Sequence, residues 1–447
     1  MRQNKPSIQI QMNKTLFRSP LLGSLLLLGF ALPVHAFDLV EAWRAARDYN
    51  ADFAAARSDL DAGREKAVQG RALLLPQIGA SANYNYTNPI TPAGQGGYDA
   101  TTYGVNLQQP LFDVGKYTGY QKGKLATQQA ETSFGAAEQQ LILDTSQAYF
   151  NVLLAKDTLS ATSASKKTFQ QQLEQAKTAF EVGTATITDT HEAQAGYDGA
   201  VAQEISAVSS LELAENNLRR VTGLDPKTIQ PVLDKLPLEL PTPATLEAWI
   251  DLAQRNSLSI KAAEQALGIA DKNVTEKKGN HLPVVSLTAG YSDSQTRAPL
   301  QAPHTRGSSI GVGVTLPLFA GGGINSQVRE AVAQQESAKD KLEATRRQVR
   351  EDVRRTFLGV TNGAALVRAQ EQLLISAKSK VESTRLGKEV GIRTNIDLLQ
   401  AEQAYYSTLT SLATAKYNYL IARLSLSQAA GQLDSEVLGK VNAVIRR

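Results

Sequence analysis

The residues that could carry out acid–base, metal or phosphate chemistry are few and scattered. His191, His281 and His304 stand alone, without an H-E-x-x-H zinc pattern or a serine nucleophile elbow around them. The glycine run 321–323 lacks the Lys-Ser/Thr of a phosphate-binding loop and the dinucleotide spacing, so we interpret it as a hinge between a strand and a helix. The chain has no Cys, which removes disulfides, Cys-based metal sites and a thiol for a lipid anchor. We therefore expect no enzyme activity, no cofactor and no metal.

Residues 1–36 are predicted to be a secretory signal peptide. Basic residues precede an apolar run over 21–32, and the small residues Val34 and Ala36 fit a cleavage site before Phe37. The leader holds four of the 47 Lys and Arg residues and no acid, so the mature chain balances its 43 acidic residues. Nucleic-acid binding is not expected from a neutral chain. No later stretch approaches about 18 consecutive apolar residues, so we expect no transmembrane helix.

Landmarks of the chain recur in the same order about 207 residues later, which indicates two copies of one supersecondary unit. The paired landmarks are 39–43 with 246–249, Pro76 with Pro283, 109–112 with 316–319, 181–183 with 389–391, and Gly223 with Gly431. We predict repeat 1 over residues 37–224, a Pro-rich linker over 225–244, repeat 2 over 245–433 and a C-terminal tail over 434–447. A doubled chain also argues against an enzyme, because an asymmetric catalytic site seldom needs duplication.

Each repeat contains a hairpin of two segments in which apolar and small polar residues alternate. The segments are 77–87 and 102–112 in the first repeat and 283–292 and 308–318 in the second. Alternation over about ten residues without a charge on the apolar side is typical of transmembrane β-strands. A hairpin packed on a soluble core is the alternative for any one hairpin. Four such segments, with aromatic residues near both ends, favour the membrane.

Four strands are too few to close a barrel, and hydrocarbon does not tolerate open strand edges. The chain must therefore oligomerise. Two copies would give eight strands with an interior filled by side chains, whereas three would give twelve strands and room for water. The small polar residues of the inner face fit a wet lumen better. Loops over 88–100 and 293–307 would lie at the surface, and nothing in them identifies a ligand.

Long helices follow the hairpins. The expected helices are an Ala-rich one before each hairpin and a long one after it: residues 39–74 and 116–182, then 246–278 and 324–390. The long helices end at Gly183 and Gly391, which are predicted C-cap residues with positive φ, and a further helix returns after each glycine. Their apolar residues repeat in sevens, so the helices wind on neighbours. Without the strands, a periplasmic coiled-coil tether that forms no pore would be an alternative.

The order and spacing of these features resemble those of the TolC-type outer-membrane efflux proteins. The features are the leader, the doubled helix–hairpin–helix unit, Glu-Ala-Trp at 41–43 and 247–249, Pro-Leu-Phe at 110–112 and 317–319, and the Val-Gly turns. The resemblance implies a mixed α/β membrane protein: a homotrimer with a twelve-stranded outer-membrane β-barrel continued by an α-helical barrel across the periplasm. It also implies the exit duct of a tripartite efflux or type I secretion system in a Gram-negative bacterium. The expected partners are a periplasmic adaptor, an inner-membrane ABC or proton-driven transporter and outer-membrane lipid, while the cargo stays open.

The resemblance places a periplasmic mouth at the turns after the long helices. Asp397 matches the first of two inward carboxylates that ring the family's constriction, and Gln400 stands where the second is expected. The ring would then hold three carboxylates instead of six. Carboxylates from three chains near one axis would repel one another and concentrate cations.

The resemblance also implies a polar latch across this mouth. Arg393 matches a basic residue that bonds toward the Thr-Asp of the first turn, here Thr188 and Asp189, and Lys388 replaces the aromatic residue expected before the second turn. An Arg–Asp bond of this kind would restrain neighbouring helices. From the residues alone, Asp189 and Asp397 are also explained as first-turn acids that stabilise helix N-termini.

Overall fold

The computed structural model describes residues 36–88, 97–233, 235–297, 303–443 and 445. All but the last residue of the predicted signal peptide lies outside these residues. Parts of the predicted surface loops do so as well, at 89–96 and 298–302.

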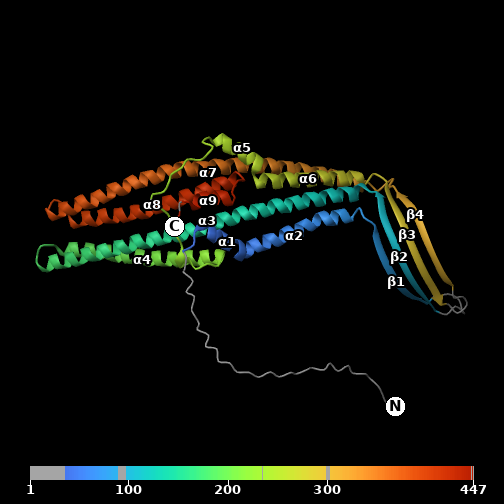
Figure 1. Cartoon of the computed structure of the whole chain (residues 1–447), viewed down its shortest axis with the longest axis horizontal. Helices are drawn as coiled ribbons and strands as arrows, with labels where there is room; N and C mark the ends of the chain where they lie inside the picture. The colour runs from blue at the N-terminus through green and yellow to red at the C-terminus, as the bar shows by residue number, and fades with distance from the viewer. Residues whose placement is uncertain (1–35, 89–96, 234, 298–302, 444, 446–447) are drawn as a thin grey trace, which may run out of the picture. The chain divides into compact units, whose positions relative to one another are not determined.

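The elements run in the same order in both halves of the chain (Figure 1). The first half contains α1 (Leu39–Tyr49), α2 (Ala51–Ala72), β1 (Gln77–Thr87), β2 (Tyr98–Phe112), α3 (Val114–Glu181) and α4 (Ile187–Thr222). The second contains α5 (Leu246–Asn256), α6 (Leu258–Gly279), β3 (Val284–Arg297), β4 (His304–Thr315), α7 (Gly323–Glu389) and α8 (Asn395–Ala429). A short 3₁₀ helix, η1 (Pro226–Thr228), begins the linker, and α9 (Ser435–Asn442) lies in the predicted tail. Within the described residues, no helix combines the length and apolar character needed to cross a membrane.

The prediction of one uninterrupted helix before each hairpin is wrong, because both stretches break. Asn50 leaves the helical conformation with ψ 123° and accepts a hydrogen bond from the Phe53 backbone N–H at 2.9 Å, so it caps α2. Ser257 makes the corresponding break between α5 and α6 with ψ 124°. Each break separates a short helix, α1 or α5, from the helix that leads into the strands.

Glycines end the long helices as the sequence predicts. Gly183 and Gly391 have φ values of 78° and 81°, in the left-handed region that favours glycine. After Gly183 the chain folds back at once, and the Thr184 backbone N–H donates to the Ala179 carbonyl at 2.8 Å. Both turns therefore lead directly into a returning helix.

The four strands form one antiparallel sheet in the order β1-β2-β3-β4. Pairing continues further toward the loops than predicted, since β3 reaches Arg297 and β4 begins at His304. At its other end β4 stops at Thr315, so the assignment of Leu316 and Leu318 to the strand is wrong. Pro317 lacks the N–H that strand pairing requires, and the chain then turns through Gly321 and Gly322, which both have positive φ.

The register separates the two faces of the sheet by chemistry. Ile78, Leu107, Ala289 and Ile310 lie in one cross-strand row, and the next row holds Gly79, Asn106, Gly290 and Ser309. On the apolar face Ile310, Val312 and Val314 are 78%, 62% and 65% exposed in the single chain. The sheet therefore presents one apolar face and one face of small polar residues, and no other described part of the chain covers either face.

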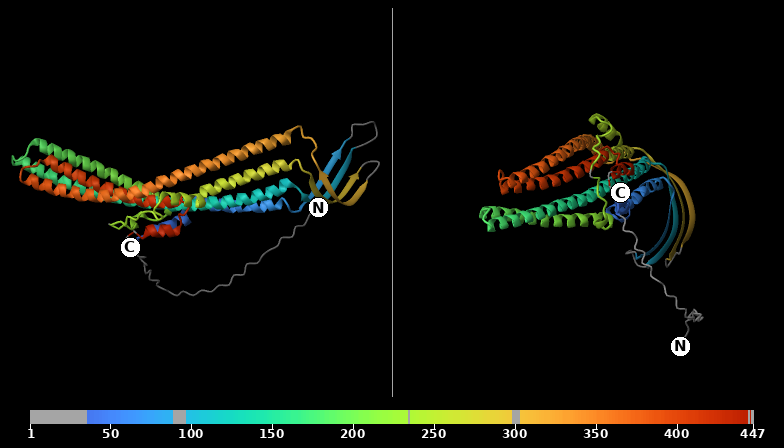
Figure 2. Two further views of the ribbon diagram at one scale, coloured as in Figure 1. Left: turned by 90° about the horizontal axis from the view of Figure 1, so that it is seen from above. Right: turned by 60° about the vertical axis from the view of Figure 1, so that its left-hand side comes forward.

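The helices pack in pairs, α3 with α4 and α7 with α8, and α3 also packs against α8 (Figure 2). The core lies around the middle of α3 and the C-terminal half of α8, where Tyr149 and Tyr419 are fully buried. Their hydroxyls donate to linker carbonyls, those of Gln230 at 2.8 Å and Glu239 at 2.7 Å. The Pro-rich linker is thus held on the helices by buried hydrogen bonds.

The C-terminal tail is part of this core. Asn442 of α9 accepts a hydrogen bond from the Leu39 backbone N–H at 2.9 Å and donates to the Asp38 carboxylate at 2.7 Å. The last helix thus caps the first one, although the bonded residues Leu39 and Asn442 are 403 positions apart in the sequence.

Candidate functional site

The turn between α3 and α4 and the turn between α7 and α8 lie at the same end of the helices, away from the sheet (Figures 1 and 2). Each turn enters its returning helix through a capping box. In the first, the Thr186 backbone N–H donates to Asp189 at 2.9 Å and the Asp189 N–H donates to Thr186 Oγ1 at 3.2 Å. Thr394 and Asp397 repeat this arrangement with the same distances.

These bonds give both predicted acids a structural role at their helix N-termini. The hydrogen bonds from Thr186 hold the pKa of Asp189 below its usual range, and those from Thr394 do the same for Asp397. Lys388 adds to the shift at Asp189, and Arg393 adds to it at Asp397. Both carboxylates are therefore ionised at neutral pH.

The other predicted latch residues are not brought together within one chain. Arg393 is exposed and, among the described residues of the single chain, makes no hydrogen bond to Thr188 or Asp189. Thr188 is exposed as well. Gln400 lies on α8 and lines a cavity between α8 and the α3/α4 pair.

Lys388 occupies the inside of the second turn. Its Nζ donates to Asn395 Oδ1 at 2.6 Å, which ties the end of α7 to the start of α8. Burial lowers the pKa of Lys388, and the nearby carboxylates of Glu402 and Asp189 oppose that shift. A cation therefore takes the place of the expected aromatic residue and lies near acids of both repeats.

A buried carboxylate that the sequence analysis did not single out lies one step further from the turn. Glu402 of α8 is 3% exposed and accepts hydrogen bonds from Gln172 Nε2 of α3 and from Arg385 Nη2 of α7, the latter at 3.2 Å. Burial raises the pKa of Glu402, and Arg385 and Lys388 oppose the shift. A signal was present in the sequence, because Glu402 follows Leu398 by four residues on the buried stripe of α8.

Polar bonds continue along the contact between α3 and α8, which we call the α3–α8 seam. The hydroxyls of Thr168 and Tyr406 are 2.7 Å apart, and the Tyr417 hydroxyl donates to Asp157 at 2.7 Å. Together with the Gln172–Glu402 bond, these contacts join the first repeat to the second by side-chain hydrogen bonds. Separation of the two helix pairs would break each of them.

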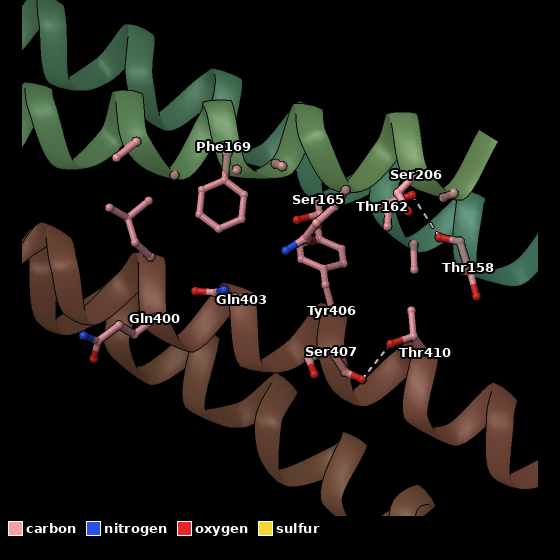
Figure 3. Close-up of a pocket in the computed structure, with 18 of the residues that line it drawn as sticks. Thr158, Thr162, Ser165, Phe169, Ser206, Gln400, Gln403, Tyr406, Ser407 and Thr410 are labelled. Atoms are coloured by element: carbon pink, nitrogen blue, oxygen red, sulfur yellow. Dashed lines mark hydrogen bonds between the residues drawn. The ribbon is translucent and has the colours of Figure 1, made fainter. Parts of the chain in front are cut away.

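Beside the seam lies a cavity of about 780 Å³ between α3, α4 and α8 (Figure 3). Ser165 and Phe169 of α3 face Gln403 and Tyr406 of α8 across it. Its lining consists largely of hydroxyl, amide and small side chains, and among the described residues no cluster of His, Cys, Asp or Glu could hold a metal. The cavity therefore offers a polar surface, and the seam beside it offers hydrogen bonds between the helix pairs.

Comparison with known proteins gives this geometry its context. The sequence profile of the family described as outer membrane efflux protein matches the chain twice, over residues 43–224 and 249–432. The chain belongs to the outer membrane efflux protein family. The two matched segments confirm the duplication and leave the linker between them.

Relatives with related roles cover nearly the whole chain. Outer membrane protein TolC of Escherichia coli (strain K12) is 32% identical over 442 residues, which are 96% of this chain and 89% of that protein. The alkaline protease secretion protein AprF of Pseudomonas aeruginosa is 32% identical over 419 residues, 91% of this chain and 87% of that one.

Among solved structures, the outer membrane protein VceC from Vibrio cholerae superposes with a TM-score of 0.76 at 19% identity, covering 88% of this chain and 96% of that one. The open state of the Neisseria gonorrhoeae MtrE outer membrane channel gives a TM-score of 0.72 at 20% identity, covering 89% and 90%. Both likenesses confirm the fold. As a member of its family, this efflux protein is an outer-membrane channel that extends into the periplasm and serves efflux or type I secretion, and it is not an enzyme. Channels of this family are trimeric, and the tether without a pore is therefore not its function.

Proposed function

We propose that three copies of this chain close a twelve-stranded barrel and a helical barrel, forming the exit duct of a tripartite system. The observation that carries the proposal is the open sheet: β1 and β4 are its edges, and the face with Ile310, Val312 and Val314 is apolar and uncovered. Strand edges in lipid must be paired, so β4 of one copy would pair with β1 of the next. The apolar face would then turn to lipid as one closed wall.

The polar face supports three copies over two. Its central rows hold only glycine, serine, threonine and asparagine: Gly79, Ser81, Asn83, Thr102, Gly104, Asn106, Gly290, Ser292, Ser294, Thr305, Gly307 and Ser309. Such side chains are too small to fill an eight-stranded interior, whereas twelve strands leave a water-filled lumen. The lumen would carry no charge at these rows, so it would pass cargo without sorting it by charge.

We further propose that the two turns form a gate at the periplasmic mouth. Asp397 from each chain would supply the ring of carboxylates, with Gln400 one helical turn behind it. Arg393 would reach Thr188 and Asp189 of a neighbouring chain, since it does not reach them within its own. The α3–α8 seam would hold the two helix pairs of one chain together, and opening would separate them.

Opening would require partners, because the polar bonds of the mouth hold it closed at rest. We propose a periplasmic adaptor and an inner-membrane transporter, of the ABC or proton-driven class, as in efflux or type I secretion. Export of the chain by the signal peptide over residues 1–36, cut before Phe37, belongs to the same proposal. The name of one relative in Pseudomonas aeruginosa, alkaline protease secretion protein, makes a secreted protein one candidate cargo.

Cysteine labelling in isolated outer membranes tests the duct, because the native chain has no Cys. Val312→Cys and Val314→Cys should be protected from a membrane-impermeant maleimide, whereas Ser309→Cys on the polar face should react. The purified protein should have the mass of a trimer in detergent and conduct ions in planar bilayers. Equal labelling at the three positions, or a water-soluble monomer, would overturn the proposal.

The gate has its own test. Arg393→Ala should raise single-channel conductance in planar bilayers, because it removes a restraint between chains. A channel whose conductance does not change in this variant would exclude the Arg393 contact and leave the duct intact.

A further inference from the structure

Glu402 is placed where its ionisation state matters to the mouth. Its carboxylate is almost completely buried between the two helix pairs, with Gln172 of α3 on one side and Arg385 of α7 on the other. Lys388 of α7 is the second cation nearby, and Asp189 of α4 faces that lysine. Arg385 lies in the same helix pair as Glu402, so of the two hydrogen bonds that Glu402 accepts, the one from Gln172 crosses the seam.

Gln172 can hold Glu402 in either ionisation state. Its Nε2 donates to the carboxylate, while its Oε1 is buried and has no hydrogen-bond partner in the part of the chain described. A carboxylate accepts hydrogen bonds only, whereas a protonated carboxyl also donates one. Rotation of the Gln172 amide would present Oε1 to that donor, and the other carboxyl oxygen would keep Arg385. The rotation turns Nε2 to the position that Oε1 leaves, so the seam keeps one hydrogen bond in either ionisation state, with its direction reversed.

We propose that Glu402 is a proton-binding site that holds the periplasmic mouth closed when it is occupied. The inference rests on the proposed gate, and it adds the proton as a ligand of that gate. One site per chain would give three in the duct.

The direction of the effect follows from burial. In the closed arrangement, removal from water raises the pKa of Glu402 above the usual range of a glutamate. Opening moves α8 away from α3 and admits water, so the pKa returns toward the usual range. The closed state therefore binds the proton more tightly, and its extra stability is present at low pH and lost as pH rises through the raised pKa.

Single-channel recordings of the full-length trimer between pH 5.0 and pH 7.5 test the proposal. For the wild type, the ratio of open to closed time should fall severalfold as the pH is lowered, with an upper bound of about tenfold per pH unit for each proton bound. Glu402→Gln mimics the protonated carboxyl group. Its ratio of open to closed time should therefore stay low, as in the wild type at low pH, and should not change with pH. Glu174→Gln, which removes an exposed carboxylate from α3 close to Gln172, is the matched control and should behave as the wild type.

A second measurement leaves Glu402 unchanged and does not depend on conduction. Ser165 is buried in α3 beside the seam, so the labelling rate of Ser165→Cys reports how far the helix pairs separate. Labelling should be at least severalfold slower at pH 5.0 than at pH 7.5, after correction for the reactivity of a free thiol. A pH response that persists in Glu402→Gln, a response of opposite sign, or labelling that does not depend on pH would each overturn the inference. If no variant conducts at any pH, the proposed duct fails instead, and the labelling still decides the role of Glu402.

Discussion

Substitution of Gln172 tests whether the α3–α8 seam controls the mouth. Gln172→Leu keeps the volume of a side chain that is 5% exposed and removes the one hydrogen bond that crosses from α3 to Glu402. A hydrogen bond to a charged group contributes about 1.5–3 kcal/mol. In the open state water replaces Gln172, so the substitution costs the closed state alone. Since about 1.4 kcal/mol corresponds to a factor of ten, the ratio of open to closed should rise on the order of 10- to 100-fold per chain.

Planar-bilayer recording at pH 7.5 measures this ratio directly. Gln170→Leu is the control, because it makes the same change at an exposed position on the same helix. It should leave the open fraction close to that of the wild type. The reasoning fails if the two leucine variants behave alike, or if Gln172→Leu makes the channel open less often.

Three further outcomes follow from the packing. Tyr406→Phe removes the 2.7 Å contact with Thr168, and because both groups are neutral, bilayer recordings should show a smaller rise in opening, corresponding to about 0.5–1.5 kcal/mol. Gly123→Ala would place a methyl carbon 2.4 Å from a backbone oxygen of α2, so thermal unfolding should show a stability lower by about 1–3 kcal/mol. Gly199→Ala is the control, because no atom lies within 4 Å of the added methyl group, and it should not destabilise the chain. Asn442→Ala removes the side chain that caps the first turn of α1, so thermal unfolding of the trimer should show a stability lower by about 1–2 kcal/mol. An unchanged stability would contradict the capping role of Asn442.

Elements with a strong local pattern could be predicted from the sequence. The alternation of Ile310, Val312 and Val314 with small residues depends only on the period of a strand, and both long helices end at glycines that need positive φ. The errors lie where a single residue overrides a pattern. Asn50 breaks a stretch of good helix formers by capping the next helix, and Pro317 ends a strand whose alternation continues beyond it.

The candidate site could be predicted from the sequence only in part, because its contacts join residues that are far apart in the chain. Gln172 and Glu402 are 230 residues apart, and their pairing depends on which faces of α3 and α8 meet. The capping roles of Asp189 and Asp397 are local and could be predicted. Contacts between chains, such as the one proposed for Arg393, depend on a neighbour that the sequence of one chain does not place.

The two repeats agree at their turns but differ beside them. Counted from the turn glycines, the position of Glu402 in the second repeat corresponds to Gln194 in the first, and that of Lys388 corresponds to Phe180. A ring of three chains therefore has six helix pairs of similar outline and two alternating kinds of junction, and the kind within a chain contains the buried Glu402. Its true symmetry is threefold. We expect such a ring to widen first at one of the two kinds of junction. One helix pair of each chain would then move during opening, while the other would stay in place.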